Sequence, residues 1–126
     1  MRVIPTIIIV FILMIASSLS SYHYINSTSK DLVTRLENVE ESVQNQKWSV
    51  AQEQLELTQT SWEKTKYWWT ILLDHHEIDN IDLSAARLKQ YLKAQDKTLS
   101  LGEVSALKML FEHIADTEAL TFKNIL

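Results

Sequence analysis

The sequence lacks cysteine and contains one glycine, Gly102, and one proline, Pro5. Without cysteine the chain can form no disulfide, no thiolate zinc site and no lipid-modified cysteine anchor. Domains built from β-strands need many tight turns, and such turns draw heavily on glycine and proline. The composition therefore predicts an all-α protein, with helices joined by short polar loops and held together by side-chain packing alone.

Basic residues are also scarce. The chain has 12 Lys and Arg against 16 Asp and Glu, which gives a formal net charge of −4. Arg2 is the only one of these charges before His23, so the remaining chain is more acidic still. Nucleic acids and anionic lipid headgroups select basic surfaces. We therefore expect no nucleic-acid partner and no attraction to anionic headgroups.

The N-terminal segment Val3 to Leu19 carries no charge and consists mainly of Ile, Val, Leu, Met and Phe. As a helix it would be roughly 26 Å long, slightly less than the ~30 Å hydrocarbon core of a bilayer. Tyr22 and Tyr24 then fall where a spanning helix meets the far interface, a position in which tyrosine is enriched. Arg2 on the short side places the N-terminus in the cytoplasm. The segment is typical of a transmembrane signal-anchor.

A cleaved signal peptide is the alternative. Its apolar core would run from Val3 to Ile15, and Ala16-Ser17-Ser18 offers small residues for cleavage. Both interpretations place the rest of the chain outside the cytoplasm. We favour the anchor, and predict a transmembrane segment over residues 1–24 and an extracytoplasmic helical domain over residues 25–126.

Three hydroxyl residues follow the anchor. Asn26-Ser27-Thr28 matches the glycosylation acceptor pattern. The same stretch, with Ser29, can instead cap a helix, and we favour that interpretation. Ser29 would then begin the first helix of the domain.

A stripe of regularly spaced, mainly apolar residues from Trp48 to His76 is the clearest helical pattern in the chain. Its members recur at spacings of three and four, which is a heptad-like pattern sustained for roughly four repeats. Near the end, Tyr67-Trp68-Trp69 and Ile71-Leu72-Leu73 widen the stripe to most of the circumference, so we expect this half of the helix to be buried on nearly all sides. The stripe comprises Trp48, Ala51, Leu55, Thr58, Trp62, Thr65, Trp69, Leu72 and His76.

Three further helical patterns complete the domain. Shorter apolar stripes cover residues 32–43 and 78–92, and a third begins at residue 101. Ser100 and Glu103 have the spacing of a capping box that opens the last helix. Residues 120–126 are expected to pack back as an extended or one-turn segment. The sequence thus predicts an N-terminal transmembrane helix followed by an antiparallel bundle of about four helices, arranged as two hairpins.

Residues 75–82 form the only cluster that suggests chemistry. On a helix His75, Asp79 and Asp82 share one face, where an imidazole and two carboxylates can hold a divalent ion such as zinc or manganese. The zinc-protease pattern is absent, because the two histidines are adjacent. His76 continues the stripe, and Asn80 or Asp82 can cap a helix. We favour structural packing over a metal site.

Four tryptophans lie close together in the sequence and invite a ligand-stacking interpretation. Trp48, Trp62 and Trp69 share one helical face, which favours core packing. Trp68 lies off that face and, with His76, is the candidate for an interaction surface. No glycine-rich loop or nucleophile motif is present, so we predict no enzyme activity and no cofactor.

Four features occur together: the N-terminal span, the helix with spaced tryptophans, a short motif and a terminal tripeptide. The motif is His75-His76-Glu77-Ile78-Asp79-Asn80-Ile81, and the tripeptide is Asn124-Ile125-Leu126. In this combination the chain resembles the small bacterial proteins grouped as domain of unknown function 4363. The resemblance implies a membrane-tethered helical domain, and it implies no activity, because none is assigned to the family. An accessory role beside multi-span membrane proteins would fit it.

The sequence therefore predicts a membrane-anchored, extracytoplasmic helical module that serves as an accessory or scaffold for another membrane or envelope protein. The alternative is a small-ligand or divalent-metal-binding protein centred on residues 75–82.

Overall fold

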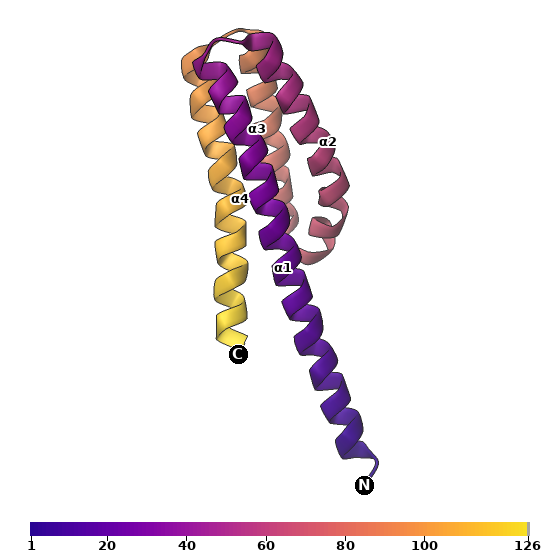
Figure 1. Cartoon of the computed structure of the whole chain (residues 1–126). Coiled ribbons are helices and arrows are strands. Elements are labelled where there is room, and N and C mark those ends of the chain that lie inside the picture. Colours follow the sequence, from indigo (N-terminus) through magenta and orange to yellow (C-terminus); the bar gives the residue numbers. More distant parts are fainter. Residues whose placement is uncertain (126) are drawn as a thin grey trace.

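The computed structural model describes residues 1–125 and contains four helices, with no strand among those residues (Figure 1). Successive helices run antiparallel, and each packs against two others, so that α1 contacts α2 and α4 while α3 contacts the same two helices. The all-α class and the bundle predicted from the sequence are confirmed. The helices are α1 (Val3–Gln44), α2 (Trp48–Leu72), α3 (His75–Lys93) and α4 (Lys97–Ile125).

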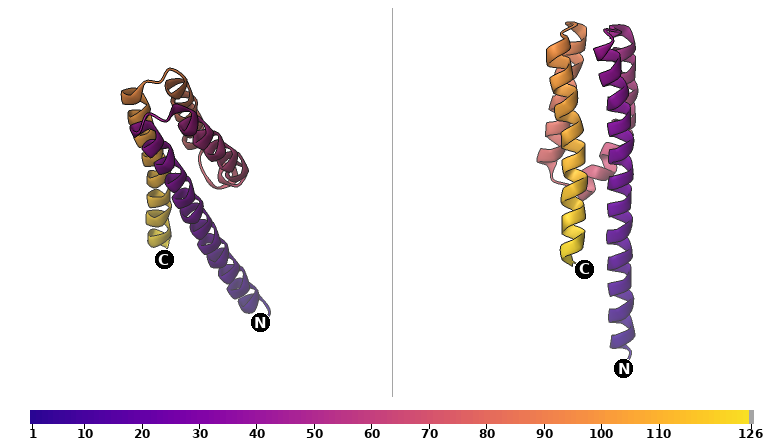
Figure 2. Two further views of the ribbon diagram at one scale, coloured as in Figure 1. Left: turned by 45° about the horizontal axis from the view of Figure 1, so that its top comes forward. Right: turned by 60° about the vertical axis from the view of Figure 1, so that its left-hand side comes forward.

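The first helix joins the apolar N-terminal segment to the bundle without a break. α1 has 42 residues, and both views in Figure 2 show it continuing past the other helices toward the N-terminus. The prediction that a new helix begins at Ser29 is therefore wrong. Ser29 lies buried in the middle of α1, and its hydroxyl donates a hydrogen bond of 2.8 Å to the backbone carbonyl of Phe111 on α4. As a cap, the side-chain oxygen of Ser29 would accept from a backbone N–H of its own helix. Here the hydroxyl bonds to a carbonyl of α4 instead.

The neighbouring hydroxyl is used in a similar way. Thr28 donates to the carbonyl of Tyr24 one turn earlier, over 2.7 Å, and so stays inside the helix. It also accepts a 3.0 Å hydrogen bond from the indole nitrogen of Trp69 on α2. Residues 26–28 are consequently helical and do not form the cap that we favoured.

The core of the bundle is aromatic. Trp62 and Trp69 of α2 meet edge to face, with ring centroids 5.3 Å apart, and both also contact the ring of Phe111. Edge-to-face pairs add stabilisation beyond the area that they bury. The Trp48–His76 stripe is confirmed in its central part, where its members are buried: Ala51, Leu55, Thr58, Trp62, Thr65 and Trp69.

The end of the stripe is different. α2 ends at Leu72 and α3 begins at His75, so His76 belongs to another helix and is exposed. The expectation that the last turns of α2 are buried on nearly all sides is also wrong. Tyr67 is 67% exposed, Trp68 55%, Ile71 62% and Leu72 38%. Only the face that carries Trp62 and Trp69 meets the other helices.

Two helix starts differ from the prediction. α3 is capped by Asp74, whose carboxylate accepts from the backbone N–H of His76 at 3.0 Å, so neither Asn80 nor Asp82 acts as its cap. α4 begins one turn before Ser100, because Asp96 accepts from the backbone N–H of Leu99. An aspartate earlier in the chain takes the capping role in both cases.

Because α4 begins before Ser100, Glu103 is not part of a capping box, and its side chain bonds to α3. It accepts hydrogen bonds from Ser84 and Arg87 of α3, and the hydrogen bond from Arg87 raises the pKa of that guanidinium. The last helix also extends further than predicted. Residues 120–125 continue α4 and are not an extended segment, while Leu126 lies outside the described residues.

The two adjacent tryptophans of α2 should respond differently to truncation. Trp69→Ala is expected to lower the free energy of unfolding by about 3–5 kcal/mol, because it removes a fully buried ring and leaves a cavity. Trp68→Ala is expected to cost less than about 1 kcal/mol, because its ring is half exposed. Denaturant titration of the full chain in detergent, followed by circular dichroism, measures both values. Equal losses at the two positions would mean that the aromatic core is not packed as described.

Candidate functional site

The three candidate metal-binding residues do not converge. His75 and Asp79 lie exposed on α3, and Asp82 is half-buried and directed at α2. Within residues 1–125, no group of three or more His, Cys, Asp or Glu side chains is placed to hold a metal ion. The carboxylate of Asp82 is moreover already occupied by two donors from α2. The geometry therefore gives the metal hypothesis no support.

Asp82 forms a polar link between α2 and α3. One of its carboxylate oxygens accepts from the indole nitrogen of Trp62 at 2.8 Å, and the other accepts from the ammonium of Lys66 at 2.5 Å. The hydrogen bond to Asp82 raises the pKa of Lys66 above its usual value. This network satisfies the one polar atom of a buried tryptophan, so its first role is structural.

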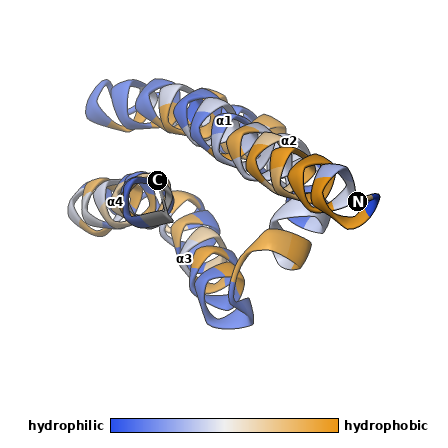
Figure 3. Ribbon diagram, turned by 90° about the horizontal axis from the view of Figure 1, so that it is seen from below, coloured by the Kyte–Doolittle hydropathy of each residue, from blue (hydrophilic) through white to orange (hydrophobic). Residues whose placement is uncertain are grey.

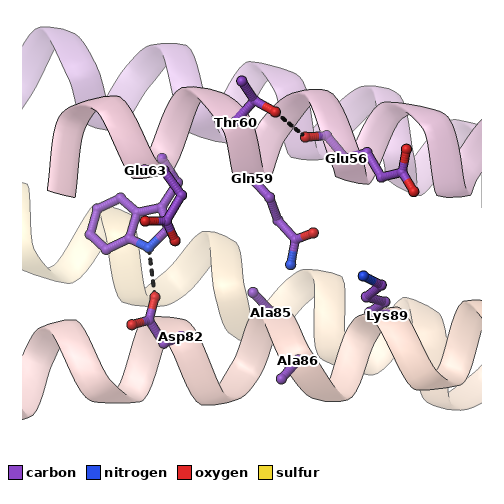
Figure 4. A pocket seen from close by; sticks show the side chains of 9 residues that line it. Glu56, Gln59, Thr60, Glu63, Asp82, Ala85, Ala86 and Lys89 are labelled. Carbon is purple, nitrogen blue, oxygen red and sulfur yellow. Dashed lines mark hydrogen bonds between the residues drawn. The ribbon is translucent and has the colours of Figure 1, made fainter.

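A polar groove of about 610 Å³ lies next to this network, between α2 and α3 (Figure 4). Gln59 of α2 and Lys89 of α3 reach into the space between the helices. Its lining carries charges of both signs and no His, Ser or Cys, and the hydroxyl of Thr60 donates to a backbone carbonyl of its own helix. The groove is suited to polar contacts and contains no nucleophile–base pair. It is lined by Glu56, Gln59, Thr60, Trp62, Glu63, Asp82, Ala85, Ala86 and Lys89.

An apolar surface lies at the end of the bundle where α1 runs on past α2 and α3 (Figure 1). No residue of α1 before Ile25 is buried, and α1 is the one helix in the described chain that is long and apolar enough to cross a membrane. A signal sequence would satisfy the same criteria. Close to this segment, the exposed side chains at the end of α2 add a second apolar surface.

We call the four exposed residues Tyr67, Trp68, Ile71 and Leu72 the α2-end patch. A groove of about 330 Å³ separates it from α1. The exposure of Trp68 is compatible with an interaction surface, but a role in binding stays a prediction, as it does for the exposed His76.

The sequence contained the signal for this patch. Residues 67, 68, 71 and 72 recur at helical spacing on a face other than that of Trp62 and Trp69. We interpreted two apolar faces on one helix as burial on all sides. Two apolar faces on one helix are equally consistent with one face in the protein core and the other against an apolar environment outside the protein.

Comparison with known proteins identifies one family. The model of the family described as "Domain of unknown function (DUF4363)" matches residues 19–125. No curated protein and no solved structure matches the chain. The matched region begins at Leu19, the end of the uncharged apolar segment, and includes the whole bundle.

Removing the Asp82 carboxylate should destabilise the bundle. Asp82→Ala leaves the indole N–H of Trp62 without its acceptor and is expected to cost about 1–2 kcal/mol. Asp79→Ala, on the exposed side of α3, is the matched control and is expected to stay within about 0.5 kcal/mol of the unchanged chain. Chemical denaturation of both variants measures the difference.

Asp82→Ala also removes the ion pair with Lys66, and the contribution of that pair to the free energy of unfolding depends on pH. Since the pKa of Lys66 is raised in the folded chain, its contribution is fully present below its ordinary value of 10.5 and is lost as the pH rises through the folded value. The difference in free energy of unfolding between Asp82→Ala and the unchanged chain should therefore become smaller at strongly alkaline pH. A difference that becomes larger there would contradict the assigned ion pair.

Proposed function

The chain belongs to the DUF4363 family, and we propose that it works as a membrane-anchored, extracytoplasmic helical module that binds another membrane or envelope protein. The observation that carries this proposal is the unbroken helix α1. Its first half is apolar and contains no buried residue, whereas its second half forms part of the bundle core. A soluble bundle would leave this exposed apolar half in water, which is unfavourable at roughly 25 cal/mol per Å².

The proposed orientation rests on charge. Arg2 precedes the apolar segment and is the only Lys, Arg, Asp or Glu before Lys30. Positive charge flanking a spanning helix favours the cytoplasmic side. The acidic bundle then lies outside the cytoplasm.

Binding of another protein is supported by the nature of the remaining surface. The groove between α2 and α3 is open, polar and of mixed charge, and it contains no arrangement for nucleophilic catalysis among its lining residues. Mixed-charge surfaces of this kind give specificity in protein recognition. An accessory or scaffold role uses such a surface without requiring chemistry.

Single cysteines test the anchor and its orientation, because the chain has none of its own. A membrane-impermeant maleimide should label Leu57→Cys, an exposed position on α2 outside the groove, in intact cells. It should not label Ile8→Cys, whose side chain would lie in the bilayer. Labelling of Leu57→Cys only after lysis would contradict the orientation. Release of a shortened chain into the medium would mean that the apolar segment is a cleaved signal sequence.

Affinity purification tests partner binding. A tagged chain, purified from solubilised membranes in several detergents, should recover the same second protein each time. The Trp69→Ala variant, which keeps the apolar segment but weakens the bundle, should lose that protein while remaining in the membrane fraction. Recovery of the unchanged chain alone in every detergent would contradict the proposal.

A further inference from the structure

We propose that the α2-end patch lies in the interfacial layer of the same bilayer that α1 enters, so that the bundle contacts the membrane at two points. This inference rests on the proposed anchor and deepens it. The occupant that we assign to the patch is lipid, and the argument follows from the position, composition and surroundings of its four residues.

The groove between the patch and α1 gives the position of the patch along α1. Three residues at the end of α2 line one side of the groove: Trp68, Ile71 and Leu72. The α1 side is lined by Ser17, Ser20, Ser21 and Tyr24. A spanning segment over Val3 to Leu19 would leave the hydrocarbon at this level of α1. The patch is therefore level with the place where α1 passes through the interface.

Figure 3 views the molecule from this end. The apolar colour covers the first half of α1 and returns at the last turn of α2, while most of α3 and α4 is mixed or polar. The two apolar surfaces therefore lie at one end of the bundle and adjoin each other across the groove. An apolar surface that continues the surface of a spanning helix meets the same lipid.

The composition of the patch suits the interface. Tyr67 and Trp68 contact each other edge to face, with ring centroids 5.4 Å apart, and present two amphipathic rings on the outer side of α2. Tyrosine and tryptophan concentrate at the level of the lipid headgroups, with aliphatic side chains beside them on the apolar side. Ile71 and Leu72 supply those aliphatic side chains one turn further along the helix.

The surroundings limit the depth of the contact. Directly after the patch the chain becomes polar, with Asp74, His75 and His76 at the start of α3, and His75 and His76 are exposed. Such a turn can lie among headgroups but not in hydrocarbon. No charged side chain lines the groove between the patch and α1. The contact is therefore apolar, and it does not require the anionic lipids that an acidic protein would repel.

Lipid quenching in vesicles tests the inference on the full chain. Three single-cysteine variants, Ile71→Cys in the patch, Leu57→Cys earlier on α2 and Ile8→Cys in the anchor, carry an environment-sensitive fluorophore. All three positions are exposed, so the label should leave the fold intact, as circular dichroism verifies. Each variant is reconstituted in phosphatidylcholine vesicles that contain nitroxide lipids, placed either near the headgroup or deep in the acyl chain.

We expect headgroup-level nitroxides to cause a large loss of emission from the Ile71 label and little loss from the Leu57 label. Deep nitroxides should quench the Ile8 label. Quenching at Ile8 without quenching at Ile71 would overturn the patch proposal and leave the anchor standing. Loss of quenching at Ile8 would overturn the anchor and, with it, the second contact.

Protein density separates lipid from a second copy of the chain. If the patch contacts lipid, quenching at Ile71 persists when the vesicles hold very little protein. A blue-shifted label at Ile71 that escapes the nitroxides, and whose shift vanishes on dilution, would show that another copy covers the patch. That outcome would overturn the assignment to lipid.

Discussion

The structure depends on the continuity of α1. A helix of 42 residues is roughly 63 Å long at 1.5 Å per residue, which is about twice the thickness of a hydrocarbon core. Its second half is one wall of the bundle, and its first half has no buried residue. Because no loop separates the two halves, the orientation of the bundle follows the orientation of the apolar segment. A flexible linker would have left the two parts independent.

Two hydrogen bonds strengthen the helix at the point where its surroundings change. Thr28 accepts from the indole of Trp69 on α2, and the next residue, Ser29, donates to the carbonyl of Phe111 on α4. These bonds tie the neighbouring helices to adjacent residues of α1, immediately after its exposed half. Since buried polar groups are costly when unpaired, each bond also holds the aromatic cluster in a single arrangement.

Packing periodicity could be predicted from the sequence, whereas helix ends and outward faces could not. The spacing from Ala51 to Trp69 correctly identified the buried face of α2, because only a helix in contact with others needs such a stripe. Ser29 and Ser100 have the residue type of caps, but tertiary contacts and the nearby Asp96 decide where helices begin. Local sequence does not reveal that a serine will find its partner on another helix.

The candidate site illustrates the same limit. His75, Asp79 and Asp82 have metal-ligand spacing within one helix, and that spacing says nothing about α2. In the folded chain Asp82 turns toward Trp62 and Lys66, because a buried indole N–H and a lysine provide two donors at once. The sequence predicted antiparallel neighbouring helices but did not show that residue 62 of α2 faces residue 82 of α3.

The distribution of exposed apolar residues is the last consequence of this architecture. A bundle in water gains by placing its apolar side chains inside, and this bundle does so along most of its length. Single apolar side chains such as Leu57, Leu83 and Met109 are exposed elsewhere, but the end where α2 stops carries Tyr67, Trp68, Ile71 and Leu72 together, beside the apolar half of α1. An unbroken α1 fixes the height of that end, so the side chains at Trp68 and Ile71 meet whatever surrounds the helix at Ser17 to Tyr24. Their apolar character then matches the environment at that level of α1, and these side chains need no place in the core.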